Sequence, residues 1–100
     1  MGMYTGTLSF DLLLGDVHSL KQKRSVLRPI VAELRRSYAV SVAEVGDQDL
    51  YRRAEIGLAV VSGDVAHVTD VLDRCERWMA ARPEVELLSV RRRLHGDHDE

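Results

Sequence analysis

The sequence of 100 residues has little cysteine, few aromatic residues and no long apolar run. The single cysteine, Cys75, excludes an internal disulfide bond and a zinc site built from several cysteines. No apolar run approaches the ~18 residues that a membrane-spanning helix needs, so we expect no contact with a membrane. The first residues lack the basic region and the apolar run of a signal peptide, and we therefore expect a cytoplasmic protein.

Composition and charge describe one folded domain. Apolar residues make up 45% of the sequence and charged residues 30%, and the formal net charge is −2. This balance is too apolar and too nearly neutral for a disordered chain, and a chain of this length holds one hydrophobic core. We predict a single domain over residues 1–94 and a polar, flexible tail over 95–100.

Apolar residues repeat with two different periods along the chain. Alternation with a period of two predicts strands over residues 4–14 and 53–60, and a short β-branched run predicts a strand over 40–45. A last strand is predicted over residues 85–94. Helical spacing predicts one helix from the Ser19 cap to about Tyr38, and a second from Asp64 to the stop at Arg82 and Pro83. The resulting order is β-α-β-β-α-β.

This order predicts an α+β fold of the ferredoxin-like type, with a four-stranded antiparallel sheet and both helices on one face. The opposite face then carries small, nearly uncharged side chains from two strands, namely Thr5, Thr7, Ser9, Gly57 and Ala59. Small side chains let another surface approach closely. The set is therefore either a solvated polar face or an interface with a protein partner or a second copy, and the sequence leaves both open.

The basic start of the first helix is the most informative feature. Residues 18–38 include six Lys or Arg and a single acid. On an ideal helix Lys21, Arg24, Arg28 and Arg35 fall within roughly 60° of one another, beside the apolar face. Cations in the first turn oppose the helix dipole, and free amides at a helix start bind anions. The row is either a site for phosphate, most simply that of RNA, or a solvated helix face.

Lys23 lies next to this row in the sequence, but its position on the helix is different. Lys23 falls inside the apolar sector, so its stem would run along the edge of the core, or the first turn would tilt at Pro29. Proline in a helix interior removes one hydrogen bond and costs about 3 kcal/mol, which predicts a kink or a short first turn there.

Ser19 and Gln22 have the form of a capping box, with Gln22 reaching back to the Ser19 amide. His18 would either meet an anion beside this cap or merely flank the cap.

A second basic run, Arg91, Arg92 and Arg93, falls on the last predicted strand. Alternation directs Arg91 and Arg93 to one face and Arg92 to the other. The last strand is an edge of the sheet in this topology, and cations on an edge prevent unwanted strand pairing. The run is therefore either an edge device or a second contact with nucleic acid. The slightly acidic chain argues against strong non-specific binding to nucleic acid.

No motif of an enzyme or a metal protein is present in the sequence. It has no glycine-rich phosphate loop and no metalloprotease helix, and Cys75 lies in an apolar helical stripe and is expected in the core. His95, Asp97, His98 and Asp99 lie on the predicted tail, so we expect neither a metal nor another cofactor. The third predicted strand has no ring that would stack on a base, so we expect contact with RNA to be to its backbone.

Three stretches together resemble a known family. They are residues 18–24 (HSLKQKR), 41–45 (SVAEV) and 53–57 (RAEIG), and the opening strand with Gly6, Thr7 and Leu8 accompanies them. With these stretches the chain resembles the YlxP-like family of small bacterial proteins over about residues 3–93. The resemblance implies a ferredoxin-like fold and no known catalytic residues. It also implies an association with translation, because the family's genes often lie among translation and ribosome-maturation genes.

Two functional hypotheses follow from these observations. The first is a non-enzymatic factor that associates with ribosomal RNA or the small ribosomal subunit through the basic helix start, with the last strand's arginines helping. In this hypothesis Lys21, Lys23, Arg24 and Arg28 contact phosphate. The second is a protein-interaction module that acts as a homodimer through the sheet face or an edge strand. An enzyme or small-ligand sensor would need Asp11, Asp16 and Glu44 brought together, and the sequence gives no reason to expect that.

Overall fold

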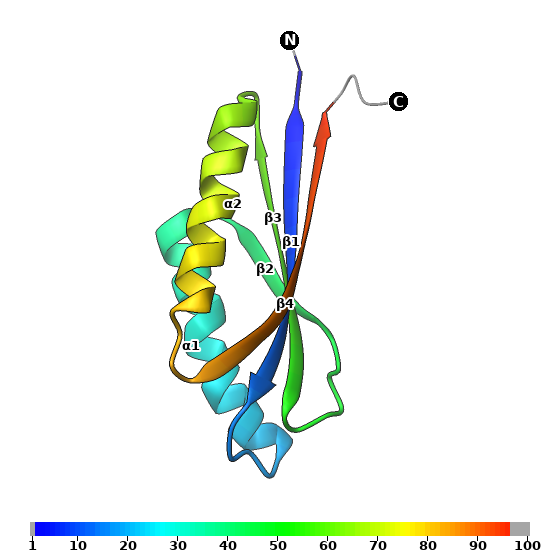
Figure 1. Cartoon of the computed structure of the whole chain (residues 1–100), viewed down its shortest axis with the longest axis vertical. Helices are drawn as coiled ribbons and strands as arrows, with labels where there is room; N and C mark the ends of the chain where they lie inside the picture. The colour runs from blue at the N-terminus through cyan, green and yellow to red at the C-terminus, as the bar shows by residue number, and fades with distance from the viewer. Residues whose placement is uncertain (1, 97–100) are drawn as a thin grey trace.

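The computed structural model describes residues 2–96 and confirms the predicted element order (Figure 1). The elements are β1 (Tyr4–Leu14), α1 (Leu20–Tyr38), β2 (Ser41–Gly46), β3 (Arg53–Ser62), α2 (Val65–Ala80) and β4 (Val85–Gly96). The strands form one antiparallel sheet in the order β2-β3-β1-β4. Both helices cover the same face of this sheet, so the predicted ferredoxin-like α+β layout is confirmed.

The core lies between the helices and the sheet, as the alternation along β1 predicts. Leu8, Phe10, Leu12 and Leu14 are buried, while the residues between them are half-buried on the other face. Burying a side chain of this size stabilises the fold by about 1.5–3 kcal/mol. Gly6 continues the buried series and lets α2 approach β1 closely. A Cβ atom there would lie 2.6 Å from Val68 Cγ1.

α1 continues through Pro29, where we expected a kink or a short first turn. The helix runs without interruption from Leu20 to Tyr38, so a separate short first turn is not formed. Pro29 is exposed, and so is Ser25, whose carbonyl Pro29 cannot serve as a hydrogen-bond donor. The helix ends at Ala39, which adopts a left-handed conformation with φ of 53° and donates its amide to the carbonyl of Arg35.

The last strand is an edge of the sheet, as predicted, and it is longer than predicted. β4 includes His95 and Gly96, because they pair with Thr5 and Tyr4 of β1. The predicted tail residues 97–100, with Asp97, His98 and Asp99, lie outside the described residues. Neither described helix combines the length and the apolar character that a membrane span requires.

Candidate nucleic-acid interface

The start of α1 is capped by side chains in a way that leaves the helix end positive. Ser19 Oγ accepts a hydrogen bond from the Gln22 amide at 3.1 Å, as predicted. Gln22 Oε1 accepts from the amide of His18 at 2.6 Å, and not from the Ser19 amide as predicted. The first turn contains no acid, so nothing on the helix offsets the positive end of its dipole.

Lys21, Arg24 and Arg28 form an exposed row on the first turns of α1, which we call the α1 cation row. All three side chains are exposed, and within residues 2–96 none of them forms an ion pair. At about 1.5 Å of rise per residue, the row spans about 10 Å along the helix. Arg35, its fourth predicted member, donates from Nη2 to the carbonyl of Val42 at 2.7 Å. That bond ties α1 to β2.

Lys23 does not belong to this row, and the prediction that it binds an anion is wrong. Its side chain is buried, with 1% of the residue exposed. Nζ donates to the carbonyls of Asp47 at 2.7 Å and Leu50 at 2.8 Å, and it lies 3.0 Å from Glu44 Oε2. The stem follows the apolar sector of the helix, so the charge ends in the loop between β2 and β3. Lys23 therefore fastens this loop to α1 and cannot reach a phosphate.

His18 is exposed and already has an acidic neighbour. Its Nε2 lies 2.5 Å from Asp16 Oδ1. A carboxylate at this distance repels a phosphate that approaches the same imidazole. Of the two alternatives for His18, the geometry therefore favours the one in which it flanks the cap.

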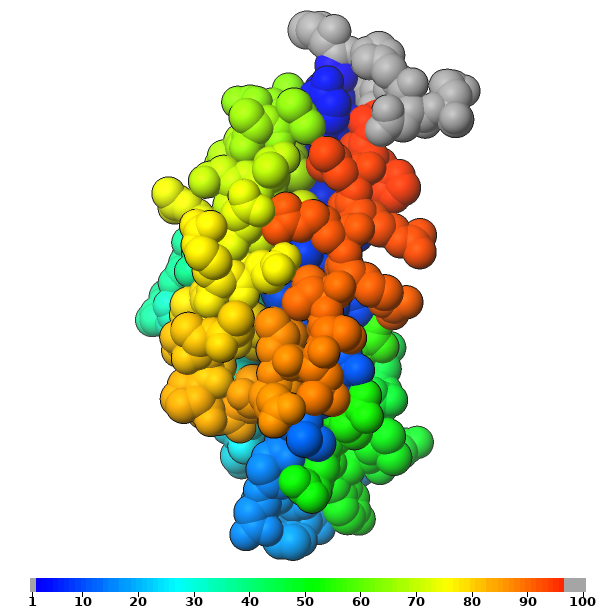
Figure 2. Space-filling view, in the orientation of Figure 1, coloured from blue at the N-terminus to red at the C-terminus, as the bar shows by residue number. Residues whose placement is uncertain are grey.

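The arginines of β4 are not brought to the α1 cation row. α1 packs on β2, and β2 and β4 are the opposite edges of the sheet. Arg92 turns to the helix side, because its ion-pair partners belong to α2. α2 and β4 lie next to each other there (Figure 2). Arg92 forms ion pairs with Asp73 at 2.9 Å and Glu76 at 3.2 Å. Two acids of α2 thus take up the charge of Arg92, which favours the edge device over a contact with nucleic acid.

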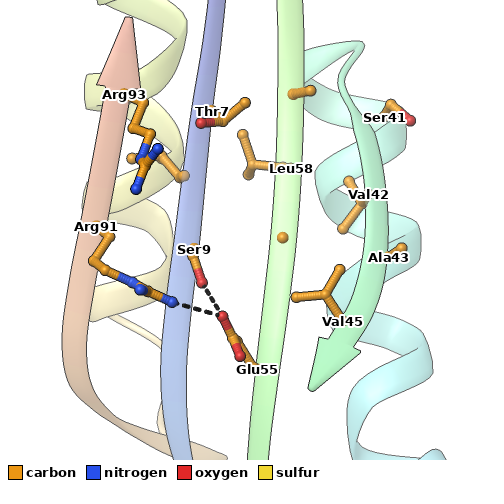
Figure 3. Close-up of a pocket in the computed structure, with 13 residues that line it drawn as sticks. Thr7, Ser9, Ser41, Val42, Ala43, Val45, Glu55, Leu58, Arg91 and Arg93 are labelled. Atoms are coloured by element: carbon orange, nitrogen blue, oxygen red, sulfur yellow. Dashed lines mark hydrogen bonds and ion pairs between the residues drawn. The ribbon is translucent and has the colours of Figure 1, made fainter.

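The predicted small residues do lie on the sheet face away from the helices, which we call the open face. The register places Thr7 beside Ala59 and Ser9 beside Gly57. With residues of β2 they line an open trough of about 450 Å³. Figure 3 shows its two sides, with arginines of β4 along one and the side chain of Val45 along the other. Thr5 lies on the same face, further toward the start of β1.

Most charged groups on the open face are paired with one another. Glu55 Oε2 accepts from Ser9 Oγ at 2.5 Å and lies 3.1 Å from Arg91 Nη2 (Figure 3). Arg53 Nη2 donates to both carboxylate oxygens of Asp11, at 2.9 and 2.7 Å, and this bonding raises the pKa of Arg53. Arg93 is the exception, since it has no acid partner among residues 2–96. Arg91 is thus compensated, and Arg93 lies on the face away from α1.

The three carboxylates that an enzyme or sensor would need are held apart. Asp11 is bound by Arg53, Asp16 lies against His18, and Glu44 faces Lys23. Each occupies a different ion pair, so these three do not form one acidic cluster. Elsewhere in the described residues, no three His, Cys, Asp or Glu side chains are placed to hold a metal ion.

Cys75 is a core residue, as predicted. It is fully buried in α2, and burial raises the pKa of its thiol to about 11. A thiol with this pKa is almost entirely protonated near neutral pH. It therefore has little nucleophilic character.

Sequence reasoning missed the contribution of β2 to both surfaces. Ser41, Ala43 and Val45 complete the trough on the open face, and Glu44 on the other side of the strand pairs with Lys23. The sequence did contain a signal for the pair of Glu44 and Lys23. An acid and a lysine each occupied a position whose spacing predicted burial, and buried charges are found in pairs.

Comparison with known proteins places the chain in a family. Residues 5–92 match the family model described as a protein of unknown function, DUF503. The chain is 32% identical over 81 residues to the uncharacterized protein YlxP of Bacillus subtilis (strain 168). That match covers 81% of this chain and 88% of the relative.

Two solved structures match the chain at low sequence identity. The de novo designed protein Foldit4 matches with a TM-score of 0.52 and 11% identity, over 97% of this chain and 99% of its own. The C-terminal domain LarC2 of a cyclometallase matches with a TM-score of 0.47 and 16% identity, over 96% of this chain and 57% of its own. At 11% identity the likeness to Foldit4 concerns the fold alone.

Proposed function

Because the chain belongs to the DUF503 family of unknown function, we propose a function from its geometry. The protein is a non-enzymatic factor of the cytoplasm that binds ribosomal RNA, within the small ribosomal subunit, through the α1 cation row. The row supplies the affinity by contacting backbone phosphates. The family that the chain resembles is associated with translation genes, so ribosomal RNA is the polyanion to test first.

The distribution of paired and free cations carries this proposal. Most Lys and Arg side chains outside the row are held by an acid or a backbone carbonyl. Those with an acid partner are Lys23, Arg36, Arg53, Arg74, Arg91 and Arg92. Lys21, Arg24 and Arg28 are neighbours on one helix face and have no acid partner among residues 2–96. Adjacent, uncompensated cations at a positive helix end are the arrangement that attracts phosphate.

The binding expected from three cations is modest and sensitive to salt. Each neutralised phosphate of a single strand contributes about −0.7 to the slope of log affinity against log salt. The net charge of −2 adds no general attraction for a polyanion, so the contact depends on the local row. Removing charges from this row should therefore abolish binding, whereas removing charges elsewhere should not.

The test is co-sedimentation of the purified protein with small ribosomal subunits at increasing salt. The variant carries Lys21→Glu and Arg24→Glu. A matched control carries Arg74→Glu and Arg77→Glu, which change the net charge equally at exposed residues of α2 away from the row. We expect wild type and control to sediment with subunits at low salt, and the row variant to stay in the supernatant.

Two results would contradict the proposal. If wild type does not bind subunits at low salt, the protein is not a ribosomal factor of this kind. If the row variant and the control lose binding equally, the α1 cation row is not the contact, and only net charge matters.

The open face supports a second candidate, a protein-interaction module that acts as a homodimer. The specific observation is the trough of about 450 Å³, whose lining includes Gly57, Ala59 and Thr7. Small side chains on a sheet face allow a second sheet to pack at about 10 Å. Sedimentation velocity over a range of concentrations tests this candidate, with Thr7→Arg as the variant. A dimer that Thr7→Arg dissociates supports it, and a monomer at every concentration refutes it.

A further inference from the structure

A groove between α1 and β2 runs beside the α1 cation row. Its volume is about 440 Å³, and two members of the row, Arg24 and Arg28, line it. The rest of its helix side and its sheet side are largely apolar, formed by Leu27, Val31, Ala32 and Ile56. The groove thus combines an apolar lining with cations that have no acid partner among the described residues.

Arg35 and Glu44 complete the groove and give it a polar pattern. Arg35 is held in place by its bond to the Val42 carbonyl at 2.7 Å. Glu44 Oε2 is buried and lies 3.0 Å from Lys23 Nζ, yet 27% of the Glu44 side chain is exposed. The groove therefore offers one ordered guanidinium group, and one carboxylate that can only accept hydrogen bonds.

We propose that this groove binds an unstacked base of single-stranded RNA, an inference that rests on the proposed function. A strand whose phosphates contact Arg24 and Arg28 brings its bases to the apolar lining beside them. Bases pack on apolar surfaces and on guanidinium planes once they are unstacked. The bases of a duplex are stacked and paired, so a duplex can contact only the cations.

Glu44 determines which occupants suit the groove. Its carboxylate repels phosphate and accepts a hydrogen bond from an amino group, such as N4 of cytosine. Uracil presents a carbonyl oxygen at the same position and is disfavoured. An acidic peptide would satisfy the arginines but would bring its own carboxylates against Glu44, so RNA fits the groove better. The lack of aromatic rings led to the expectation of backbone contact alone, and this groove adds contact with a base.

The test measures fluorescence anisotropy with labelled RNA oligomers of equal length at one salt concentration. The probes are oligo(C), oligo(U) and a duplex with the same number of phosphates. The variant Ala32→Leu fills the groove from an exposed helix position, where leucine is a good helix former. The control Ala66→Leu makes the same change at an exposed position of α2.

We expect wild type and Ala66→Leu to bind oligo(C) roughly five-fold more tightly than oligo(U) or the duplex. Ala32→Leu should bind all three probes equally and keep the wild-type salt slope. Equal binding of the three probes by wild type would overturn the groove assignment, and so would a preference that survives in Ala32→Leu. Competition by oligo-glutamate that Ala32→Leu abolishes would also overturn it, by assigning the groove to a protein partner.

Failure of the groove and failure of the proposed function give different results. If Lys21→Glu with Arg24→Glu abolishes binding of every probe but wild type does not discriminate among them, only the groove assignment fails. If wild type binds none of the probes at low salt, the proposed function fails as well.

Discussion

Replacing Lys23 with methionine separates a structural cation from the binding cations around it. Methionine keeps the apolar stem in the helix and removes the ammonium group. The carbonyls of Asp47 and Leu50 then lose the donors at 2.7 and 2.8 Å, and Glu44 loses the charge at 3.0 Å. The loop between β2 and β3 is left without its attachment to α1.

The cost follows from these contacts. A hydrogen bond from a charged donor contributes about 1.5–3 kcal/mol, and removing one partner of a buried ion pair costs about 3–5 kcal/mol. Since 27% of the Glu44 side chain is exposed, solvent relieves part of this cost. We expect a loss of about 3–4 kcal/mol, which is a large part of the ~5–15 kcal/mol that stabilises a domain.

Urea denaturation followed by circular dichroism measures this loss. With an m-value of about 1.5 kcal/mol/M, the midpoint should fall by about 2 M. Lys21→Met is the matched control, because it removes the same group from an exposed position two residues away, and it should change stability by less than about 0.5 kcal/mol. A Lys23→Met midpoint within experimental error of wild type would refute the buried anchoring of Lys23.

Three further outcomes follow from the packing. Gly6→Ala should lower the free energy of unfolding by about 1–3 kcal/mol in urea denaturation, since the new Cβ would lie 2.6 Å from Val68 Cγ1. Gly15→Ala should leave the stability unchanged, because open space surrounds Gly15. Equal losses of stability in the two variants would contradict this packing. The Cys75 thiol should resist alkylation at pH 8 until urea unfolds the protein. Because burial raises its folded pKa from 9.0 to about 11, the unfolded thiol loses its proton first, and stability should fall as pH rises from 9 toward 11. Ala39→Gly should raise stability by about 1 kcal/mol in thermal unfolding, since φ at this position is 53°; a lower melting temperature would contradict the left-handed cap.

The fold could be predicted from local patterns because its signals are local. Alternation along residues 4–14 identified the buried face of β1, and Ser19 and Asp64 marked both helix starts. The split order of elements then left few arrangements that cover one sheet face with two helices. The prediction failed at element ends, such as His95 and Gly96, which depend on pairing with a distant strand.

The candidate site could be predicted only in part. The spacing of residues along a helix shows which side chains share a face, but it does not show which groups of other elements they contact. The spacing placed Lys21, Arg24 and Arg28 together, and they are exposed together. The same spacing marked Lys23 as anomalous, but the two carbonyls that accept from its Nζ belong to a loop further along the chain, and the carboxylate that pairs with it belongs to β2. The acids that compensate Arg92 belong to α2, and only the packed structure brings them together.

The salt dependence of RNA binding tests the central claim most directly. Affinity for a single-stranded fragment of ribosomal RNA is measured over a salt series for wild type, for Lys23→Met, and for the triple variant Lys21→Gln, Arg24→Gln and Arg28→Gln. The α1 cation row predicts a slope shallower by about 2 in the triple variant. It predicts an unchanged slope in Lys23→Met. Equal slopes for wild type and the triple variant would show that the row does not contact phosphate and would contradict the proposed function.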